Sequence, residues 1–321
     1  MIVSRSRTDS TSGVTGNSRR NALIDIPGWE TQWIHLGPGP LNHLATRVRF
    51  GTGTVATLQT ASAGILRGST PPDSMSLLTS LSATQCLRSE AQPIGGDTAL
   101  LLGSASHLDL YLPEGGEVIV LSAPAAGMAT GARCLKLDSN QVSSLGRCVD
   151  SLHQFRSSSD QLRHAAGAPR ELRTLLRSLA DSVFRDADPQ LHAKPARLLR
   201  HLAVTRACDY IEAHLRVPIS LADLCASAGV STRALEYGFR DFYDLGPMAY
   251  VRSLRLCRVR EDLLDSARHG NSVSNTARRW CFSHMGQFSH DYRGLFGEMP
   301  STTLSRPDHA VERHGSGVSR E

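Results

Sequence analysis

The chain has 321 residues, of which 40% are hydrophobic and 20% are charged, the balance of an ordinary globular protein. This length allows two domains, each with its own hydrophobic core. No stretch approaches the roughly 20 apolar residues that a membrane-spanning helix needs, so the sequence predicts a soluble, cytoplasmic protein. The net charge of +5 suits an acidic partner such as nucleic acid but is too small to indicate one by itself.

Residues 1–25 are predicted to form a disordered tail. The first twenty residues are rich in Ser, Thr, Gly and Arg and lack the apolar stretch of a signal peptide. Seven cysteines stand at positions 86, 134, 148, 208, 225, 257 and 281, without the close pairs of a disulfide framework or a zinc site. Cys208, Cys225 and Cys257 fall at apolar positions of predicted helices, so we expect small buried side chains there.

From Trp33 to about Ala123, short runs rich in Val, Leu, Ile and Thr alternate with turn residues, which predicts a β-barrel or sandwich. The runs are residues 43–50, 54–58, 75–81, 98–102, 108–112 and 118–121. The segment from Pro113 to Gly116 separates the last two runs and is predicted to be a hairpin loop.

A small barrel can hold a small molecule in its interior or mouth. The candidates to line such a site are Trp33, His35, Arg47 and Arg49. A strand with one buried and one solvated face explains the same residues, and we favour that interpretation. The strands contain no cluster of His and Glu with the spacing of a metal site, so the sequence predicts no metal, no cofactor and no metal-dependent barrel enzyme.

Helices are predicted after Asp138. Apolar residues recur at helical spacing from Val142 to Leu152 and again from Leu172 to Val183. Either stripe could pack on the strands or pair with a second copy of the chain. The polar segment from Asp186 to Pro195 contains two prolines and is predicted to link the strands and their helices to a second domain.

The last third of the chain contains one pattern twice, and each copy is predicted to be a helix-turn-helix unit. In the first copy, Ser220 begins a helix that Gly229 ends in the left-handed conformation. Ser231 then caps a second helix, which buries Leu235 and Phe239 on one side.

The second copy starts at Val273, begins its second helix near Ser283 or His284, and ends at Gly297 and Pro300. The apolar stripe of that second helix, with steps of four residues, is formed by Phe288, Tyr292 and Phe296. One amphipathic helix of this kind is equally well explained as an ordinary core helix. Two copies in tandem favour a pair of DNA-binding units.

A helix predicted from Pro247 to Ser266 joins the two copies. At 1.5 Å per residue it spans roughly 30 Å, close to the ~34 Å between successive major-groove faces on one side of B-DNA. The two second helices could therefore enter adjacent grooves. Fifteen arginines, no lysine and 11 acidic residues lie between Arg197 and Arg306. The arginines expected to form a phosphate-binding patch are Arg252, Arg255, Arg258, Arg260, Arg278, Arg279 and Arg293.

The segment from Arg197 to Pro307 resembles the DNA-binding domain of the AraC/XylS transcriptional regulators. The most specific match is WCFSHMGQFSHDYRGLFGEMP, residues 280–300, and YVRSLRL, residues 250–256, resembles the start of the family's linker helix. The resemblance implies an α+β fold. A jelly-roll or cupin-like β-barrel with flanking helices (26–187) would precede a linker (188–196), an all-α domain with two helix-turn-helix units (197–306) and a disordered tail (307–321).

The resemblance also implies which side chains meet DNA. The residues expected to contact bases are Arg233, Glu236 and Tyr237 in the first unit, and Met285, Gly286, Ser289 and His290 in the second. The residues expected to contact phosphate are Gln287, Arg240 and Arg293. Arg can pair with guanine and Glu can accept a hydrogen bond from cytosine, whereas Met, Ser and His distinguish bases less sharply. We therefore expect the first unit to be more selective. The resemblance identifies no effector-binding residue.

Two positions depart from the family pattern. The family usually has glycine where Cys281 and Asp244 stand, and a Cβ is strained where the backbone needs a positive φ. Asp tolerates the left-handed region better than most residues. We therefore expect the turn of the second unit to be altered more than the end of the first.

The predicted function is a sequence-specific DNA-binding regulator of transcription, an activator that responds to a small molecule bound in the barrel. Its expected partners are double-stranded promoter DNA, the effector, RNA polymerase and a second copy of the chain, with the helices after the barrel forming the dimer. An enzyme with a barrel active site is one alternative, but the sequence shows no nucleophile with its base and no paired carboxylates. A helical protein-interaction module is the other.

Overall fold

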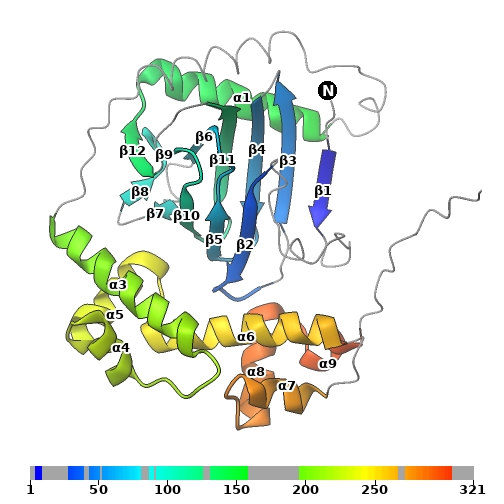
Figure 1. Cartoon of the computed structure of the whole chain (residues 1–321). Helices are drawn as coiled ribbons and strands as arrows, with labels where there is room; N and C mark the ends of the chain where they lie inside the picture. Colours follow the sequence, from blue (N-terminus) through cyan, green and yellow to red (C-terminus); the bar gives the residue numbers. More distant parts are fainter. Residues whose placement is uncertain are drawn as a thin grey trace, which may run out of the picture.

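The computed structural model describes residues 4–8, 28–39, 43–50, 53–80, 87–89, 92–125, 131–157, 195–266 and 272–305. In Figure 1 the strands form one body with helix α1 along one side, and the helices from α3 onward lie against the opposite side. The predicted order, strands followed by an all-helical part, is confirmed.

The strands form two antiparallel sheets. In the seven-stranded sheet the order is β1 (Ser4–Thr8), β3 (His43–Phe50), β4 (Gly53–Thr60), β11 (Glu117–Pro124), β6 (Ser74–Thr79), β9 (Thr98–Leu102) and β12 (Ala132–Lys136). In the five-stranded sheet the order is β2 (Glu30–His35), β5 (Gly64–Ser69), β10 (His107–Leu112), β7 (Leu87–Ser89) and β8 (Gln92–Ile94). This is the β-sandwich that the alternating runs predict.

The predicted hairpin at Pro113–Gly116 is wrong. Strand β10 pairs with β5 and β7, whereas β11 pairs with β4 and β6, so this loop crosses from one sheet to the other. The Gly116 N–H does close a tight turn on the Pro113 carbonyl, at 2.9 Å. A turn signal fixes how the chain reverses, but it does not fix which strands become neighbours.

Strand β5 has no apolar run in the sequence because two of its residues are glycines. A Cβ at Gly64 would lie 2.2 Å from the Trp33 ring, and a Cβ at Gly68 would lie 2.1 Å from the Glu30 carbonyl oxygen. Both glycines therefore allow β2 to pack closely on β5. The same residues that permit this contact weaken the sequence signal for the strand.

The two faces of the five-stranded sheet contact different parts of the molecule. Trp33, Leu66 and Leu110 are aligned across β2, β5 and β10, and all three are buried in the interior of the sandwich. The next row, Ile34, Ile65 and Tyr111, points the other way. It shares one hydrophobic core with the C-terminal helices.

The solvated face predicted for this strand is therefore wrong. Both Trp33 and His35 are buried, and the outer face of the sheet is covered by helices. Alternation along a strand shows that two faces exist, but it does not show what packs on the second one. The side chains of Arg47 and Arg49, the other two candidates, lie outside the described residues.

The helices are α1 (Ser139–Ser157), α3 (Pro195–His214), α4 (Leu221–Ala228), α5 (Thr232–Tyr243), α6 (Pro247–Ser266), α7 (Val273–Arg279), α8 (Met285–Phe296) and α9 (Pro300–Leu304). Helix α3 begins at Pro195, at the end of the predicted linker. The second predicted stripe, from Leu172 to Val183, lies outside the described residues.

His35 joins β2 to the last turn of α8. Its Nε2–H donates to the Leu295 carbonyl at 2.9 Å, so its Nδ1 is the acceptor, and the Ser62 hydroxyl lies 3.2 Å from it. The imidazole also stacks on Phe296, with ring centroids 5.5 Å apart. The Gly39 N–H reaches the same Leu295 carbonyl at 3.2 Å. A carbonyl in the last turn of a helix has no partner within the helix, so these two donors cap α8.

Burial lowers the pKa of His35 to about 4. A histidine in the unfolded chain titrates near 6.5, so below that pH the unfolded chain binds a proton that the folded chain does not. The free energy of unfolding therefore contains a contribution from His35 that is present above pH 6.5 and is lost as the pH falls towards 4.

We expect His35→Gln to flatten the pH dependence of stability. Between pH 7.5 and 4.5 the wild-type chain should lose roughly 2 kcal/mol more than the variant, measured by urea unfolding at each pH. His290→Gln, which removes an exposed imidazole, is the control and should follow the wild-type profile. Parallel profiles for the wild type and His35→Gln would contradict this role of His35.

Candidate nucleic-acid interface

The first helix-turn-helix unit consists of α4 and α5. The Ser220 hydroxyl accepts the Asp223 N–H at 3.2 Å, and the Asp223 carboxylate accepts the Ser220 N–H at 2.8 Å, which completes a capping box. Gly229 ends α4 at φ 69°, and the Ser231 hydroxyl caps α5. The helix ends predicted from the sequence are confirmed.

Helix α5 presents one exposed stripe. Arg233, Tyr237 and Arg240 lie on it, while Glu236 is partly buried at its side. Leu235 and Phe239 are fully buried on the opposite face, where Phe239 packs edge-on against Tyr250 of α6. The predicted division of α5 into a core face and an outward face is confirmed.

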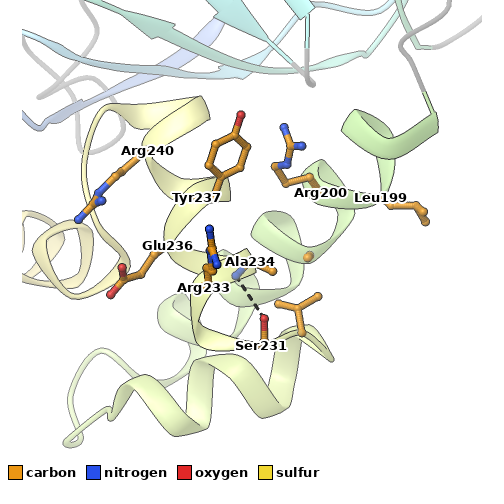
Figure 2. Close-up of a pocket in the computed structure, with 10 residues that line it drawn as sticks. Leu199, Arg200, Ser231, Arg233, Ala234, Glu236, Tyr237 and Arg240 are labelled. Carbon is orange, nitrogen blue, oxygen red and sulfur yellow. Dashed lines mark hydrogen bonds between the residues drawn. The ribbon is translucent and has the colours of Figure 1, made fainter.

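The stripe borders a groove of about 630 Å³ between α3 and α5 (Figure 2). The residues that line this groove are Leu199, Arg200, Ala203, Val230, Ser231, Arg233, Ala234, Glu236, Tyr237 and Arg240. All three first-unit residues expected to contact bases are among them. The structure therefore brings Arg233, Glu236 and Tyr237 together at one concave surface.

Arg200 of α3 belongs to this surface, and the sequence did not identify it. Its guanidinium lies 4.4 Å from the centroid of the Tyr237 ring and donates to the Asp241 carboxylate at 2.9 Å. Figure 2 shows Arg200 and Tyr237 facing each other across the groove. A cation over an aromatic face restricts the ring, so Arg200 limits where the Tyr237 hydroxyl can point. Only the packing of α3 against α5 creates this pair.

The second unit consists of α7 and α8. Helix α8 starts after His284, as predicted, and buries Phe288, Tyr292 and Phe296. Gly286, His290 and Arg293 are exposed on its other side. Gln287 is exposed as well, and its side-chain amide donates to Asp291 at 2.7 Å.

Two of the base-contact candidates in α8 are less accessible than the sequence suggests. Met285 is partly buried against the hydrophobic core, and Ser289 is partly buried. Met285 stands in the first turn, where the helix still touches Phe282 and the rest of the unit, so periodicity alone cannot separate inward from outward positions there. Gly286 and His290 keep the exposure that a base contact requires.

The arginines of α6 do not form the open basic patch predicted from their number. Arg260 is buried and paired with Glu298, and Arg258 pairs with Glu261 at 2.8 Å. Arg255 donates to two carbonyls that follow α3, and Arg252 lies 3.4 Å from Asp291. Arg252, Arg255 and Arg260 therefore hold α6 to its neighbours, whereas Arg258 pairs within α6 itself.

The exposed arginines of the two units are better placed for phosphate. The side chains of Arg233, Arg240, Arg278 and Arg293 make no hydrogen bond or ion pair within the part of the chain that the structure describes. Arg279 is exposed but lies 3.4 Å from Asp262. The positive charge available to a ligand is therefore concentrated beside the helix-turn-helix units and not along α6.

The turns of the two units have the same backbone conformation. Gly229 has φ 69° and Cys281 has φ 64°, and the N–H of the next residue reaches five residues back in both, to Cys225 and Ala277. This is the Schellman arrangement that normally has glycine at the left-handed position. The positive φ expected at Cys281 is confirmed, but the predicted alteration of this turn is wrong, because it keeps the hydrogen bonding of the first unit.

No group of three or more His, Cys, Asp or Glu residues that could bind a metal ion occurs among the described residues. Within the same part of the chain, no helix is both long enough and apolar enough to cross a membrane.

The geometry defines the class of protein: two helix-turn-helix units joined by one long helix. A family model described as "Helix-turn-helix domain" matches residues 224–306. The probable thc operon regulatory protein of Rhodococcus erythropolis is 37% identical over 101 residues, which are 32% of this chain and 30% of that protein. The XylDLEGF operon transcriptional activator of Pseudomonas putida is 28% identical over 165 residues, 51% of this chain and 47% of that one.

A solved structure of a probable AraC family transcriptional regulator from Rhodopseudomonas palustris CGA009 is 36% identical, covering 33% of this chain and 98% of that chain, with a TM-score of 0.31. The C-terminal part of the chain, including residues 224–306, is similar to the helix-turn-helix domain of the AraC/XylS transcriptional regulators. The chain spans about a third to a half of the length of the curated relatives named above.

We expect Cys281→Gly to stabilise the chain. Glycine adopts a φ of 64° without the clash that a Cβ causes, and this gain exceeds the extra backbone entropy of glycine in the unfolded state. The free energy of unfolding should rise by up to about 1 kcal/mol, measured by urea unfolding. Cys281→Ala is the matched control because it removes the thiol but keeps the Cβ. Equal stability of the two variants would show that the left-handed backbone is unstrained.

Proposed function

We propose that this protein is a sequence-specific DNA-binding regulator of transcription that acts in the cytoplasm. The observation that supports this most directly is the pair of exposed stripes on α5 and α8, each opposite a buried face, in two units that pack on the same helix. With about 20 residues, α6 spans roughly 30 Å, which suits adjacent major-groove faces of one duplex.

In this proposal the two units have different tasks. Arg233 and Glu236 have the side chains that discriminate guanine and cytosine best, and Tyr237 is 58% exposed beside them. In α8, Gly286 and His290 are exposed but discriminate between bases less sharply, and Met285 and Ser289 are partly buried. Arg240, Arg293 and Gln287 contact phosphate and set the register of the protein on the duplex.

We propose further that the protein is an activator that contacts RNA polymerase. The names of the Pseudomonas putida relatives, which are transcriptional activators, support the proposed activation. The dimer predicted from the sequence stays a prediction. On α1, Leu145 and Val149 are buried within a single chain, so these two side chains are not available to a second copy.

We propose that the effector binds at the inward face of β2. Trp29 Nε1 and Thr31 Oγ1 are buried, and neither has a hydrogen-bond partner among the described residues. Trp29 packs in the apolar interior of the sandwich, and Thr31 stands two residues further along, so both face inward. A buried donor without an acceptor is costly, and an oxygen of a ligand would relieve both. The effector class is therefore a small, mainly apolar molecule with a carboxylate or carbonyl oxygen.

The alternatives make different predictions. A helical protein-interaction module should have no salt-dependent affinity for duplex DNA. An enzyme should consume a small molecule that the sandwich binds. We therefore titrate the full-length protein with its own upstream DNA at several salt concentrations. A specific complex whose affinity falls steeply with salt supports the regulator, and affinity that is absent or independent of salt contradicts it.

Arg233→Ala should weaken discrimination at one base position by ~1–3 kcal/mol, because one bidentate contact to a base is lost. The measurement is fluorescence anisotropy with a set of duplexes that each differ from the operator at one position. Arg206→Ala removes an exposed arginine of α3 that does not line the groove, so it should leave the ranking of the duplexes unchanged. An unchanged ranking for Arg233→Ala would exclude it as a base contact.

Thr31→Val should weaken effector binding about tenfold, since it keeps the shape of the side chain and removes a hydrogen bond to a charged oxygen. The probe is a panel of small monocarboxylates and their amides, with tryptophan fluorescence as the readout. Thr205→Val, an exposed threonine on α3, is the control. If both variants bind the best ligand as the wild type does, the effector does not contact Thr31.

A further inference from the structure

Asp244 is the residue that follows α5, and its side chain leaves the helical part of the molecule. Its Oδ2 accepts a hydrogen bond from the Tyr111 hydroxyl at 2.7 Å, and its Oδ1 pairs with Arg88 Nη1 at 2.9 Å. Tyr111 belongs to β10 and Arg88 to β7, and the two are direct cross-strand neighbours. The Arg88 guanidinium also lies 4.9 Å from the centroid of the Tyr111 ring. One carboxylate thus contacts two adjacent strands.

The backbone at Asp244 indicates that this contact matters. Asp244 has φ 57° and ψ 13°, the left-handed conformation that ends α5 and that glycine adopts most easily. An aspartate there accepts strain that glycine would avoid. Within the described residues, its side chain makes polar contacts only with Tyr111 and Arg88. The Asp244 side chain therefore binds the strands and does not cap the end of α5.

Tyr111 depends on Asp244 in turn. Its side chain is only 3% exposed, because the helices cover the outer face of the sheet. A buried tyrosine hydroxyl needs a hydrogen-bond partner, and Asp244 supplies the acceptor. Burial and the hydrogen bond to Asp244 raise the pKa of Tyr111, so the hydroxyl keeps its proton and remains the donor.

The same sheet also contacts the second unit. At its other side, β2 places His35 on the Leu295 carbonyl and the Phe296 ring, in the last turn of α8. Between these two points, Arg67 of β5 pairs with Glu212 of α3. The five-stranded sheet therefore touches the C-terminal ends of both recognition helices. The exposed stripes of α5 and α8 begin at the opposite ends, near Arg233 and Gly286.

We infer that Asp244 is a positioning residue that couples the first recognition helix to the five-stranded sheet through Tyr111 and Arg88. Through this contact, the orientation of α5 on DNA depends on the conformation of the strands that carry Tyr111 and Arg88. The inference rests on the proposed DNA-binding function, and it assigns to the sheet a direct influence on the more selective of the two units. By linkage, DNA that reorients α5 must also disturb the contact with Tyr111.

The test is a double-mutant cycle in the full-length protein with Asp244→Gly, Tyr111→Phe and the double variant. Glycine suits the left-handed backbone, so Asp244→Gly keeps the helix end folded while removing the carboxylate. Tyr111→Phe removes one hydroxyl in the strands, far in sequence from the helical domain, and changes no charge. The readout is the dissociation constant for the upstream duplex.

We expect Tyr111→Phe to change this constant by roughly fivefold in the chain that retains Asp244 and to have no effect in the chain that carries Asp244→Gly. Such non-additivity cannot come from a role confined to the end of α5. A Tyr111→Phe variant that binds the duplex as the wild type does, or an equal effect in both backgrounds, would overturn the inference.

The same cycle is measured by urea unfolding without DNA. If the wild type shows no salt-dependent duplex binding, the proposed function fails, and the unfolding cycle still decides the coupling. Non-additive free energies of unfolding support the contact between Asp244 and Tyr111, and additive ones contradict it.

Discussion

The arrangement of this molecule depends on the outer face of its five-stranded sheet being covered. Ile34, Ile65 and Tyr111 lie in one row across three strands and share a core with the C-terminal helices. Left in water, this row would expose a contiguous apolar surface on the sheet. Burial on both faces lets polar side chains at its rim, such as His35 and Arg67, find partners in α8 and α3. The sandwich and the helical part are therefore joined by a core as well as by the chain.

The helical part depends in a similar way on α6. Tyr250, near the start of this helix, packs against Phe239 of the first unit, while Asp262, near its end, accepts the indole N–H of Trp280 in the second. Each unit is small, and neither could bury its apolar stripe alone. Helix α6 thus contributes side chains to the hydrophobic cores of both helix-turn-helix units. This sharing explains why its arginines are engaged in ion pairs and helix capping inside the domain.

The sequence predicts this fold best where the governing interactions are local. The capping box at Ser220, the glycine at 229 and the stripe on α8 are all set by residues within one or two turns, and each of these predictions is confirmed. The failures are non-local. The loop after Pro113 looks the same whether its strands pair or not, and the pairing of Arg200 with Tyr237 exists only after α3 packs on α5. The prediction that Arg260 binds phosphate is wrong, because a count of charges says nothing about partners 38 residues away.

The engagement of the arginines on α6 has a consequence for how such a protein would find its site on a chromosome. Loose attachment to arbitrary DNA comes mainly from cations that displace condensed counterions. Three of the four α6 arginines are paired with carboxylates, so α6 itself would add little to such attachment, which would rest on the exposed arginines of the two units and would be brief. Target location would then proceed by many brief encounters, with residence determined by recognition of base edges.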